Sequence, residues 1–458
     1  MGKSLHIQGR KGNKFSQQLR GVNLEQVLIV AIDAAKLHQK ALICNFFGDI
    51  IVKPFFFSVN ESGIQLLCDR IKQAEKDCDA VRIFLGVEAT GHYYEDIVRI
   101  LAKHGYQVQI INPYTTKEER ASALNWCKTD DLDLVAIAYA MVGNKATESK
   151  LPEGHYRQLL TLTRARRSEV RKRSTLRMEI RGLMDVIWRE YQGFSSNDHG
   201  KPTKTTVFSD MWGKSSLFVM KHYPHPSMVM SLGETGLREI SRKHNLKIRS
   251  STIQKLLRVA NQALSRPKEE LGAELLLLRM KLEDLERYDE KITRLEQEIE
   301  SVLLQTDGRL LLSIPGIAVV TAAEAYAEIG DVSQYENPHQ IIKKAGTNPV
   351  VIQSGGGKGY YGAISKQGNE HLRYVVYTAG KCLSLHNTEL RPFYERLKEK
   401  GKHARKIHIA MGNKFIKIAF AMLRDKKPFL YQNSQNHYLS EMSKKLRFHS
   451  KTNDLLAS

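Results

Sequence analysis

The segment QVLIVAIDAA, residues 26–35, decides the fold, because it reads as a short buried strand that ends on an aspartate, Asp33. A brief run rich in Val, Ile and Leu favours a strand over a helix. A second run of this kind, VRIFLGVEA at residues 81–89, ends on Glu88. Two predicted strands therefore carry an acid at the same end.

The elements around these runs indicate the fold class. KALICNFFGDIIVKPFFF (40–57) reads as two strands, helix-like stretches cover 62–76 and 93–103, and QVQIIN (107–112) reads as a further strand. A three-stranded meander followed by strand, helix and strand is the element order of a ribonuclease-H-like fold. In that fold the first and fourth strands lie side by side and run parallel.

The two acids should therefore meet at one edge of the sheet. Asp33 and Glu88 would lie within a few ångströms of each other at the carboxyl edge, where open α/β sheets place their ligands. The simpler interpretation of either residue is a turn former.

Two more acids follow in NWCKTDDLDLVAIAYA, residues 125–140. If Thr129 caps a helix, Asp130 and Asp133 share one face and Asp131 points elsewhere. Acids in a first helical turn also commonly just complement the helix dipole. Four converging carboxylates in a basic protein instead suit Mg²⁺ or Mn²⁺, and a pair of such ions assists phosphoryl transfer.

Composition points to a polyanionic partner. The chain has 458 residues, 70 Lys and Arg against 49 Asp and Glu, and a formal net charge of +21. Nucleic acid is the leading candidate. We find no apolar run long enough to span a membrane and no signal peptide, so we expect a cytosolic protein without a membrane partner. The five cysteines form no CxxC pair and support neither a disulfide framework nor a zinc site.

The pattern of the chain predicts five parts. These are a basic leader (1–22), an α/β domain (23–160), a helical and coiled-coil region (161–304) with a basic insertion (about 192–250), a mainly helical domain (305–430) and a polar tail (431–458). The composition of the insertion predicts partial order.

The helical region contains a seam of apolar residues. Leu271 to Leu285 step by four and three, and the pattern resumes from Tyr288 to Val302 after a phase shift. Such a seam fits an intramolecular hairpin as well as a dimer interface. The arginine-rich run 164–191 would supply the partner, and we expect its arginines to contact nucleic acid rather than form a merely solvated face.

The stretch IQSGGGKGYYGAISKQGNEHLRY, residues 352–374, contains two candidate hydroxyls. It is not a phosphate-binding P-loop, because Lys358 is followed by glycine rather than Ser or Thr. Ser354 is either part of a flexible spacer or a nucleophile, which would need a base or a metal to activate it. Ser365, the rival hydroxyl, looks more like the start of a helix with Arg373 facing phosphate.

Several long motifs together resemble one family. AIDAAKLHQ, GVEATGHYYEDIV, INPYTTKEERA and CKTDDLDLVAIA are similar to the N-terminal half of the DEDD transposases, the insertion-sequence family that includes the pilin-gene invertases. LLSIPGIAVVTAAEAYAEIGDVSQY and the serine-bearing stretch resemble its C-terminal domain. The resemblance covers roughly 26–165 and 305–430.

The resemblance implies a site and partners. Asp33, Glu88, Asp130 and Asp133 fall on the D, E, D and D of a RuvC-like metal site, and Ser354 falls on the serine thought to attach covalently to DNA. A non-coding RNA from the element is implied to select donor and target DNA. We expect further nucleic-acid contacts from Lys128, Lys358, Lys366 and Arg373.

The sequence therefore predicts a transposase or site-specific recombinase, assembled as a dimer or tetramer in the prokaryotic cytosol or nucleoid. Ser354 would cut DNA with metal assistance at the four acids. Two alternatives stay open. In a hydrolytic RuvC-like nuclease or resolvase, water attacks and the serine is structural. In a non-catalytic nucleic-acid-binding protein, the acids have no chemical role.

Overall fold

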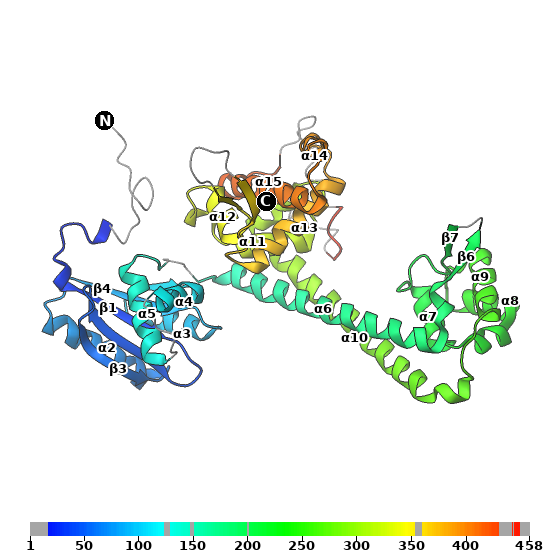
Figure 1. Ribbon diagram of the computed structural model, residues 1–458, viewed down its shortest axis with the longest axis horizontal. Coiled ribbons are helices and arrows are strands. Elements are labelled where there is room, and N and C mark those ends of the chain that lie inside the picture. Colours follow the sequence, from blue (N-terminus) through cyan, green and yellow to red (C-terminus); the bar gives the residue numbers. More distant parts are fainter. Residues whose placement is uncertain are drawn as a thin grey trace. The chain divides into compact units, whose positions relative to one another are not determined.

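The structure is a computed structural model that describes residues 17–122, 129–146, 151–198, 201–352, 360–429, 442 and 444–448. The chain divides into two compact units, Met1–Leu151 and Pro152–Ser458, which are drawn in Figure 1. The predicted Lys128, Ser354 and Lys358 lie outside the described residues.

The first unit is built on a five-stranded mixed sheet with the strand order β3-β2-β1-β4-β5. β1 pairs antiparallel with β2 and parallel with β4, so the predicted pairing of the first and fourth strands is confirmed. The strands are β1 (Val27–Asp33), β2 (Gln39–Asn45), β3 (Ile50–Phe57), β4 (Arg82–Glu88) and β5 (Val108–Ile111).

Helices cover both faces of this sheet because β1 is apolar at every position up to its end. Leu28 and Val30 belong to the core beneath α2 (Glu61–Asp77) and α3 (Tyr93–Lys103). The alternate residues Ile29 and Ala31 belong to the core beneath α5 (Asp130–Val142), against which α4 (Pro113–Ser122) packs. A strand buried on both faces reads as a continuous apolar run, which explains the sequence of this segment.

The second unit is almost entirely helical, so a mixed α/β domain followed by a helical remainder is confirmed. None of the helices in the described part of the chain is long and apolar enough to cross a membrane. Its main helices are α6 (Gly154–Trp188), α7 (Lys214–His222), α8 (Pro226–Lys243), α9 (Ser250–Asn261), α10 (Gly272–Leu304), α11 (Val319–Ile329), α12 (Pro338–Ala345), α13 (Glu370–His386), α14 (Arg391–Glu399) and α15 (Ala404–Asp425). Two small hairpins, β6 (Phe194–Asp198) with β7 (Lys201–Thr205) and β8 (Pro349–Ile352) with β9 (Tyr360–Ile364), complete it.

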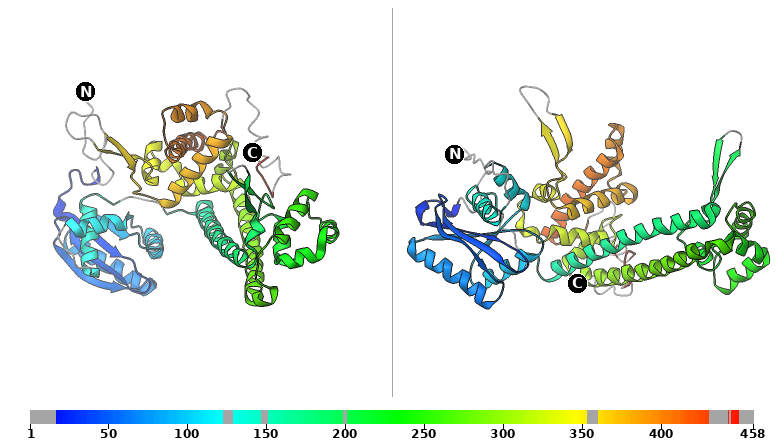
Figure 2. Two further views of the ribbon diagram at one scale, coloured as in Figure 1. Left: turned by 45° about the vertical axis from the view of Figure 1, so that its right-hand side comes forward. Right: turned by 60° about the horizontal axis from the view of Figure 1, so that its bottom comes forward.

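The long helices α6 and α10 form an antiparallel pair, visible side by side in Figures 1 and 2. Ion pairs run along it with residue numbers rising on one helix and falling on the other: Arg166 with Glu296 at 2.7 Å, Arg173 with Asp289 at 2.6 Å and Glu179 with Lys281 at 2.5 Å. The predicted seam residues Leu278, Leu282 and Leu285 are buried in one core with Leu176 and Ile180 of α6. The intramolecular hairpin is therefore present, and supercoiling of the pair stays a prediction.

The end of this pair carries a small helical assembly, residues 189–271, which we call the distal subdomain. Here the structure differs from the partial order expected for residues 192–250. Val219 of α7, Leu237 of α8 and Leu256 of α9 are buried in one core with Trp188 and Tyr191. The polar composition concealed amphipathic helices, whose few apolar residues recur at helical spacing and meet on one side.

The C-terminal helices pack closely around α13. A Cβ atom on Gly380 of α13 would lie 1.9 Å from the carbonyl oxygen of His408, and one on Gly412 of α15 would lie 2.0 Å from that of Val376. These two glycines therefore let the helices approach at backbone contact. Helix α15 packs on this domain, with Met411 and Phe415 fully buried.

The helix pair yields a test of the core. Ile180→Ala should lower the free energy of unfolding by about 2–5 kcal/mol, because it leaves a cavity between α6 and α10. Met178→Ala is the matched control: this side chain is 64% exposed on the same helix and should change stability by about 0.5 kcal/mol or less. Denaturant unfolding of both variants measures the difference. Equal losses would contradict the assigned seam.

Candidate active site

Asp33 and Glu88 are the last residues of neighbouring parallel strands. Ile32 stands opposite Val87 in the register. Asp33 and Glu88, the next residue on each strand, are therefore at the same level of the sheet. Adjacent strands lie about 4.8 Å apart, so the two half-buried residues are neighbours at the carboxyl edge of the sheet. The Thr90 hydroxyl donates a hydrogen bond to Glu88 at 3.1 Å and orients that carboxylate.

Helix α5 carries the other two predicted acids, Asp130 and Asp133. The Thr129 hydroxyl accepts a hydrogen bond from the Leu132 amide at 3.3 Å, so the predicted cap is confirmed. Asp133 is buried on the side of α5 that covers the sheet, whereas Asp130 is exposed. Asp131 is exposed and forms an ion pair with Lys40 at 2.5 Å, and its pointing away from the face shared by Asp130 and Asp133 stays a prediction.

Two cations that the sequence did not single out accompany these acids. Arg120 of α4 forms an ion pair with the buried Asp133. Lys40 of β2 stands opposite Asp33 in the strand register and reaches Asp131. The register of the β1–β2 hairpin could have revealed Lys40, since its partner position follows from the turn. Arg120 meets Asp133 only through the packing of α4 on α5.

The described acids of this unit match a divalent metal in donor chemistry but are not gathered around one point. Among the described residues, no group of three or more His, Cys, Asp or Glu side chains is close enough together to hold an ion. The donors offered by β1, β4 and α5 are carboxylate oxygens, which Mg²⁺ and Mn²⁺ prefer. The donor chemistry fits, and Asp133 would have to exchange Arg120 for the metal.

The serine-bearing segment connects β8 to β9, and the structure describes its stem. Ile352 pairs with Tyr360 in an antiparallel hairpin, whose strands extend away from the helices in the right-hand view of Figure 2. At the base of the stem, the hydroxyl of Ser365 bonds to the Asn348 side chain at 3.0 Å. The expected helix start at Ser365 is wrong, because α13 begins at Glu370. Asn369, rather than Ser365, is the residue whose side chain can accept from the free amides of the first turn.

Lys366 and Arg373, predicted to contact nucleic acid, lie at this same base. Arg373 donates to the carbonyl oxygens of Ala345 and Lys366 at 3.1 and 3.0 Å, which ties α13 to the end of the hairpin. The Lys366 side chain is exposed, and its backbone has a positive φ of 56°. Contact of either residue with nucleic acid stays a prediction.

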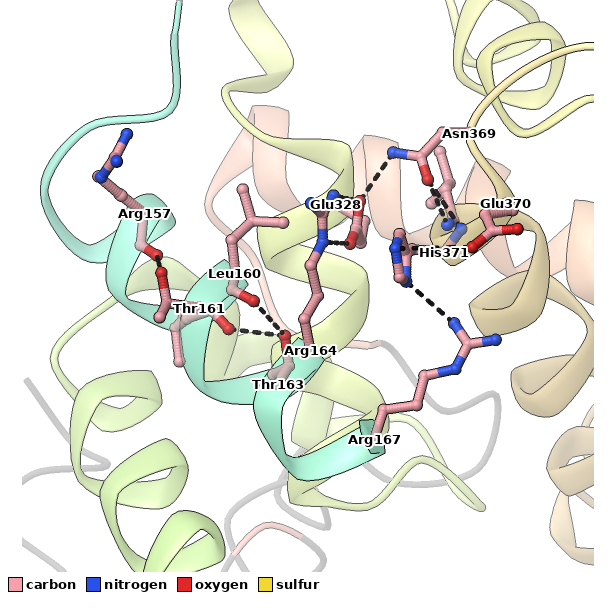
Figure 3. A network of polar contacts seen from close by, with 12 residues as sticks. Arg157, Leu160, Thr161, Thr163, Arg164, Arg167, Glu328, Asn369, Glu370 and His371 are labelled. Atoms are coloured by element: carbon pink, nitrogen blue, oxygen red, sulfur yellow. Dashed lines mark hydrogen bonds and ion pairs between the residues drawn. The ribbon is translucent and has the colours of Figure 1, made fainter. Parts of the chain in front are cut away.

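A network of polar contacts joins this base to α6, as Figure 3 shows. The carboxylate of Glu328 accepts two hydrogen bonds from Arg164, at 2.8 and 3.1 Å, and one from Asn369 at 2.8 Å. Asn369 in turn caps α13 through the amides of His371 and Leu372. One buried carboxylate therefore holds α6, α11 and the start of α13 together.

Several arginines of α6 are engaged by acids or aromatic rings of the same chain, and contact of this helix with nucleic acid stays a prediction. Arg164, Arg166 and Arg173 are paired with acids. Arg167 lies 3.7 Å from the ring centre of Tyr374, and Arg177 lies 5.0 Å from that of Trp212. The sequence showed the cations but not the acids and rings that neutralise or cover them.

Glu324 of α11 lies beside this network and is buried. Burial raises its pKa to about 7, against the opposing effect of Arg166 and Arg167. The carboxyl group is thus costly to ionise where it stands, and its charge changes near neutral pH.

Two family models match the sequence of this chain. Residues 30–189 match a family model described as a transposase of the DEDD type, IS110 group, and residues 308–395 match the transposase family of IS116, IS110 and IS902. The class is therefore that of insertion-sequence transposases. The chain belongs to the IS110-type DEDD transposase family.

Individual relatives agree with this assignment. The IS116 insertion-element protein of Streptomyces clavuligerus is 22% identical over 404 residues, which is 87% of this chain and 95% of that protein. The pilin gene-inverting protein of Moraxella bovis is 27% identical over 153 residues, covering 32% of this chain and 48% of that protein. The transposase for element IS1111A of Coxiella burnetii is 28% identical over 144 residues, covering 31% and 39%.

Glu324 generates a pH-dependent prediction. In the folded protein the pKa of Glu324 is about 7, above its ordinary value of 4.5. With respect to this group, the free energy of unfolding is therefore highest below pH 4.5 and falls as the pH rises through about 7. Glu324→Gln should therefore raise the free energy of unfolding at pH 8 by about 1–3 kcal/mol and change it little at pH 5. Unfolding at both pH values measures this. Glu298→Gln, an exposed acid on α10, is the control and should show no such difference.

Proposed function

We propose that this transposase cuts and rejoins DNA by a metal-assisted attack of Ser354 on a backbone phosphorus. The observation that carries the proposal is the parallel pairing of β1 with β4, which brings Asp33 and Glu88 to one sheet edge in a chain of this family. Asp130 and Asp133 of α5 are the further proposed ligands. The expected cofactor is Mg²⁺ or Mn²⁺.

The proposed step conserves the number of phosphoester bonds. The Ser354 oxygen forms a bond to phosphorus, the bond to one sugar oxygen breaks, the serine loses its proton and the departing sugar oxygen gains one. The resulting phosphoserine link has about the energy of the ester it replaces, so a DNA hydroxyl can later reverse it without a further energy source. A bound divalent ion would stabilise the charge on the attacking and leaving oxygens.

The roles of this chain's own groups follow from chemistry and position. A serine hydroxyl is a weak nucleophile at neutral pH and needs activation. The hairpin stem holds the serine-bearing segment at a fixed base, where Asn348, Asn369 and Arg373 are bonded to backbone or side chains. Lys358 and Lys366 are proposed to hold the phosphate.

DNA is the proposed substrate, with an element-encoded non-coding RNA as guide and a dimer or tetramer as the working assembly. The net charge of +21 supports a nucleic-acid partner. Leu276, Leu277 and Met280 are 46–58% exposed on α10 and support self-association through that helix. Isolating the protein with its nucleic acid and sequencing the RNA tests the guide.

The nucleophile is tested by trapping. Wild-type protein incubated with DNA and Mg²⁺ should yield a protein–DNA adduct that survives denaturing electrophoresis. Ser354→Ala should abolish it, because no other hydroxyl is assigned to the step, whereas Ser365→Ala should retain it. Cleavage by Ser354→Ala without an adduct would favour the hydrolytic nuclease instead.

The metal site is tested by a pair of neighbouring acids. Asp130→Asn should weaken Mn²⁺ binding, measured by calorimetry, by at least tenfold, because it removes one proposed ligand. Asp131→Asn should leave Mn²⁺ affinity within about twofold, since Asp131 is paired with Lys40. If Asp33→Asn leaves both Mn²⁺ binding and DNA cleavage unchanged, the non-catalytic alternative stands and the proposed chemistry fails.

A further inference from the structure

The distal subdomain carries an open groove between α7 and α9 that lies outside both family matches. Its walls come from residues 206–210, the first turn of α7, the loop before α9 and the first turns of α9. Lys214, Lys247, Arg249 and Lys255 line it and are all exposed. The groove is thus a concave surface with cations on both sides.

These four cations make no ion pair among the described residues. By contrast, neighbouring cations are paired: Lys221 with Glu286, Arg238 with Glu234, Arg266 with Glu274 and Lys281 with Glu179. The groove lining includes one carboxylate, Asp210, which accepts a hydrogen bond from the Trp212 amide.

The local excess of charge extends beyond the groove. Residues 206–258 contain nine Lys and Arg against three Asp and Glu. Unpaired cations held together on a concave wall repel one another in the free protein. An anionic ligand would relieve that repulsion.

The groove also offers neutral donors on a fixed wall. Ser215 and Thr252 line it at the starts of α7 and α9, and neither helix has a side-chain cap. A buried hydrogen bond fixes the α7 side of the groove: the hydroxyl of the fully buried Tyr191 donates to the Ser216 carbonyl oxygen at 2.7 Å. Hydroxyls, backbone amides and Lys or Arg together are the groups that contact phosphate oxygens.

We propose that this groove binds the phosphate backbone of duplex DNA flanking the cleaved site, an inference that rests on the proposed function. The contact would position DNA without reading its sequence, because the lining cations meet phosphates rather than base edges. The groove's aromatic side chain, Phe208, is half-buried, which favours a duplex over an unstacked single strand.

The helix pair sets where on the DNA this contact falls. α6 has 35 residues and runs from the serine-bearing domain to the distal subdomain, as Figure 1 shows. At about 1.5 Å per residue it spans roughly 50 Å, which equals about 15 base pairs of duplex. The groove should therefore contact DNA roughly that far from the base pairs handled by the serine-bearing domain.

The test uses the full chain with four substitutions in the groove, Lys214→Gln, Lys247→Gln, Arg249→Gln and Lys255→Gln. Binding to a 60-base-pair duplex is measured over a range of salt concentrations. The slope of log affinity against log salt should become shallower by about 3.6, since each of the four lost phosphate contacts contributes about 0.9. The matched control removes four paired cations of the same region, Lys221, Arg238, Arg266 and Lys281, and should change the slope by less than about 1. Circular dichroism and thermal unfolding establish that both variants fold.

Equal slopes for the two variants would overturn the proposal, and so would a groove variant that loses affinity for a structured RNA hairpin but not for the duplex. Adduct formation on a duplex trimmed to within about 8 base pairs of the cut is measured in parallel. That short substrate cannot reach the groove, so the groove variant should still form the adduct on it. If wild-type protein forms the adduct but the groove and control variants have the same salt slope, the groove proposal fails and the proposed function stands. If wild-type protein forms no adduct, the proposed function itself fails.

Discussion

The parallel pairing of β1 with β4 is the constraint on which the rest of the first unit depends. It joins two segments that are far apart in the chain and brings Asp33 and Glu88 to the same edge. A shift of one residue in this register would send each side chain to the opposite face, so the buried residues on both faces fix it. The position of the acids is therefore a consequence of core packing rather than of any attraction between them.

Charge is the second constraint, because a buried carboxylate such as Asp133 needs a cation nearby. In the structure, Arg120 meets Asp133 and Lys40 meets Asp131. The second unit follows the same rule, with Arg164 bonded to Glu328 and Arg173 to Asp289. Many Lys and Arg side chains are thus paired with acids inside the chain. The formal net charge of +21 already subtracts all such pairs, so that excess of cations is left for a partner.

The sequence predicted the sheet well because its strands are long apolar runs with turns between them. The order of elements fixed the neighbours, and Thr129 fixed the start of α5. It predicted less where partners meet through tertiary packing. Arg373 turned to backbone carbonyls, α13 began at Glu370, and the distal subdomain folded despite its polar composition. The motif residues Lys128, Ser354 and Lys358 lie outside the described part of the chain, and their roles rest on the family resemblance.

The second unit resolves a geometric problem that the proposed chemistry creates. A nucleophile on a hairpin must be held by a stable base while DNA is moved and exchanged. Glu328 ties that base to α6, and α6 continues without interruption to the distal subdomain. A continuous helix transmits position over its length, because its backbone hydrogen bonds resist bending. Duplex DNA held at both ends of such a rod is constrained in distance as well as in orientation. The unpaired cations of the groove thus stand where a flanking contact would align the scissile phosphate with the hairpin.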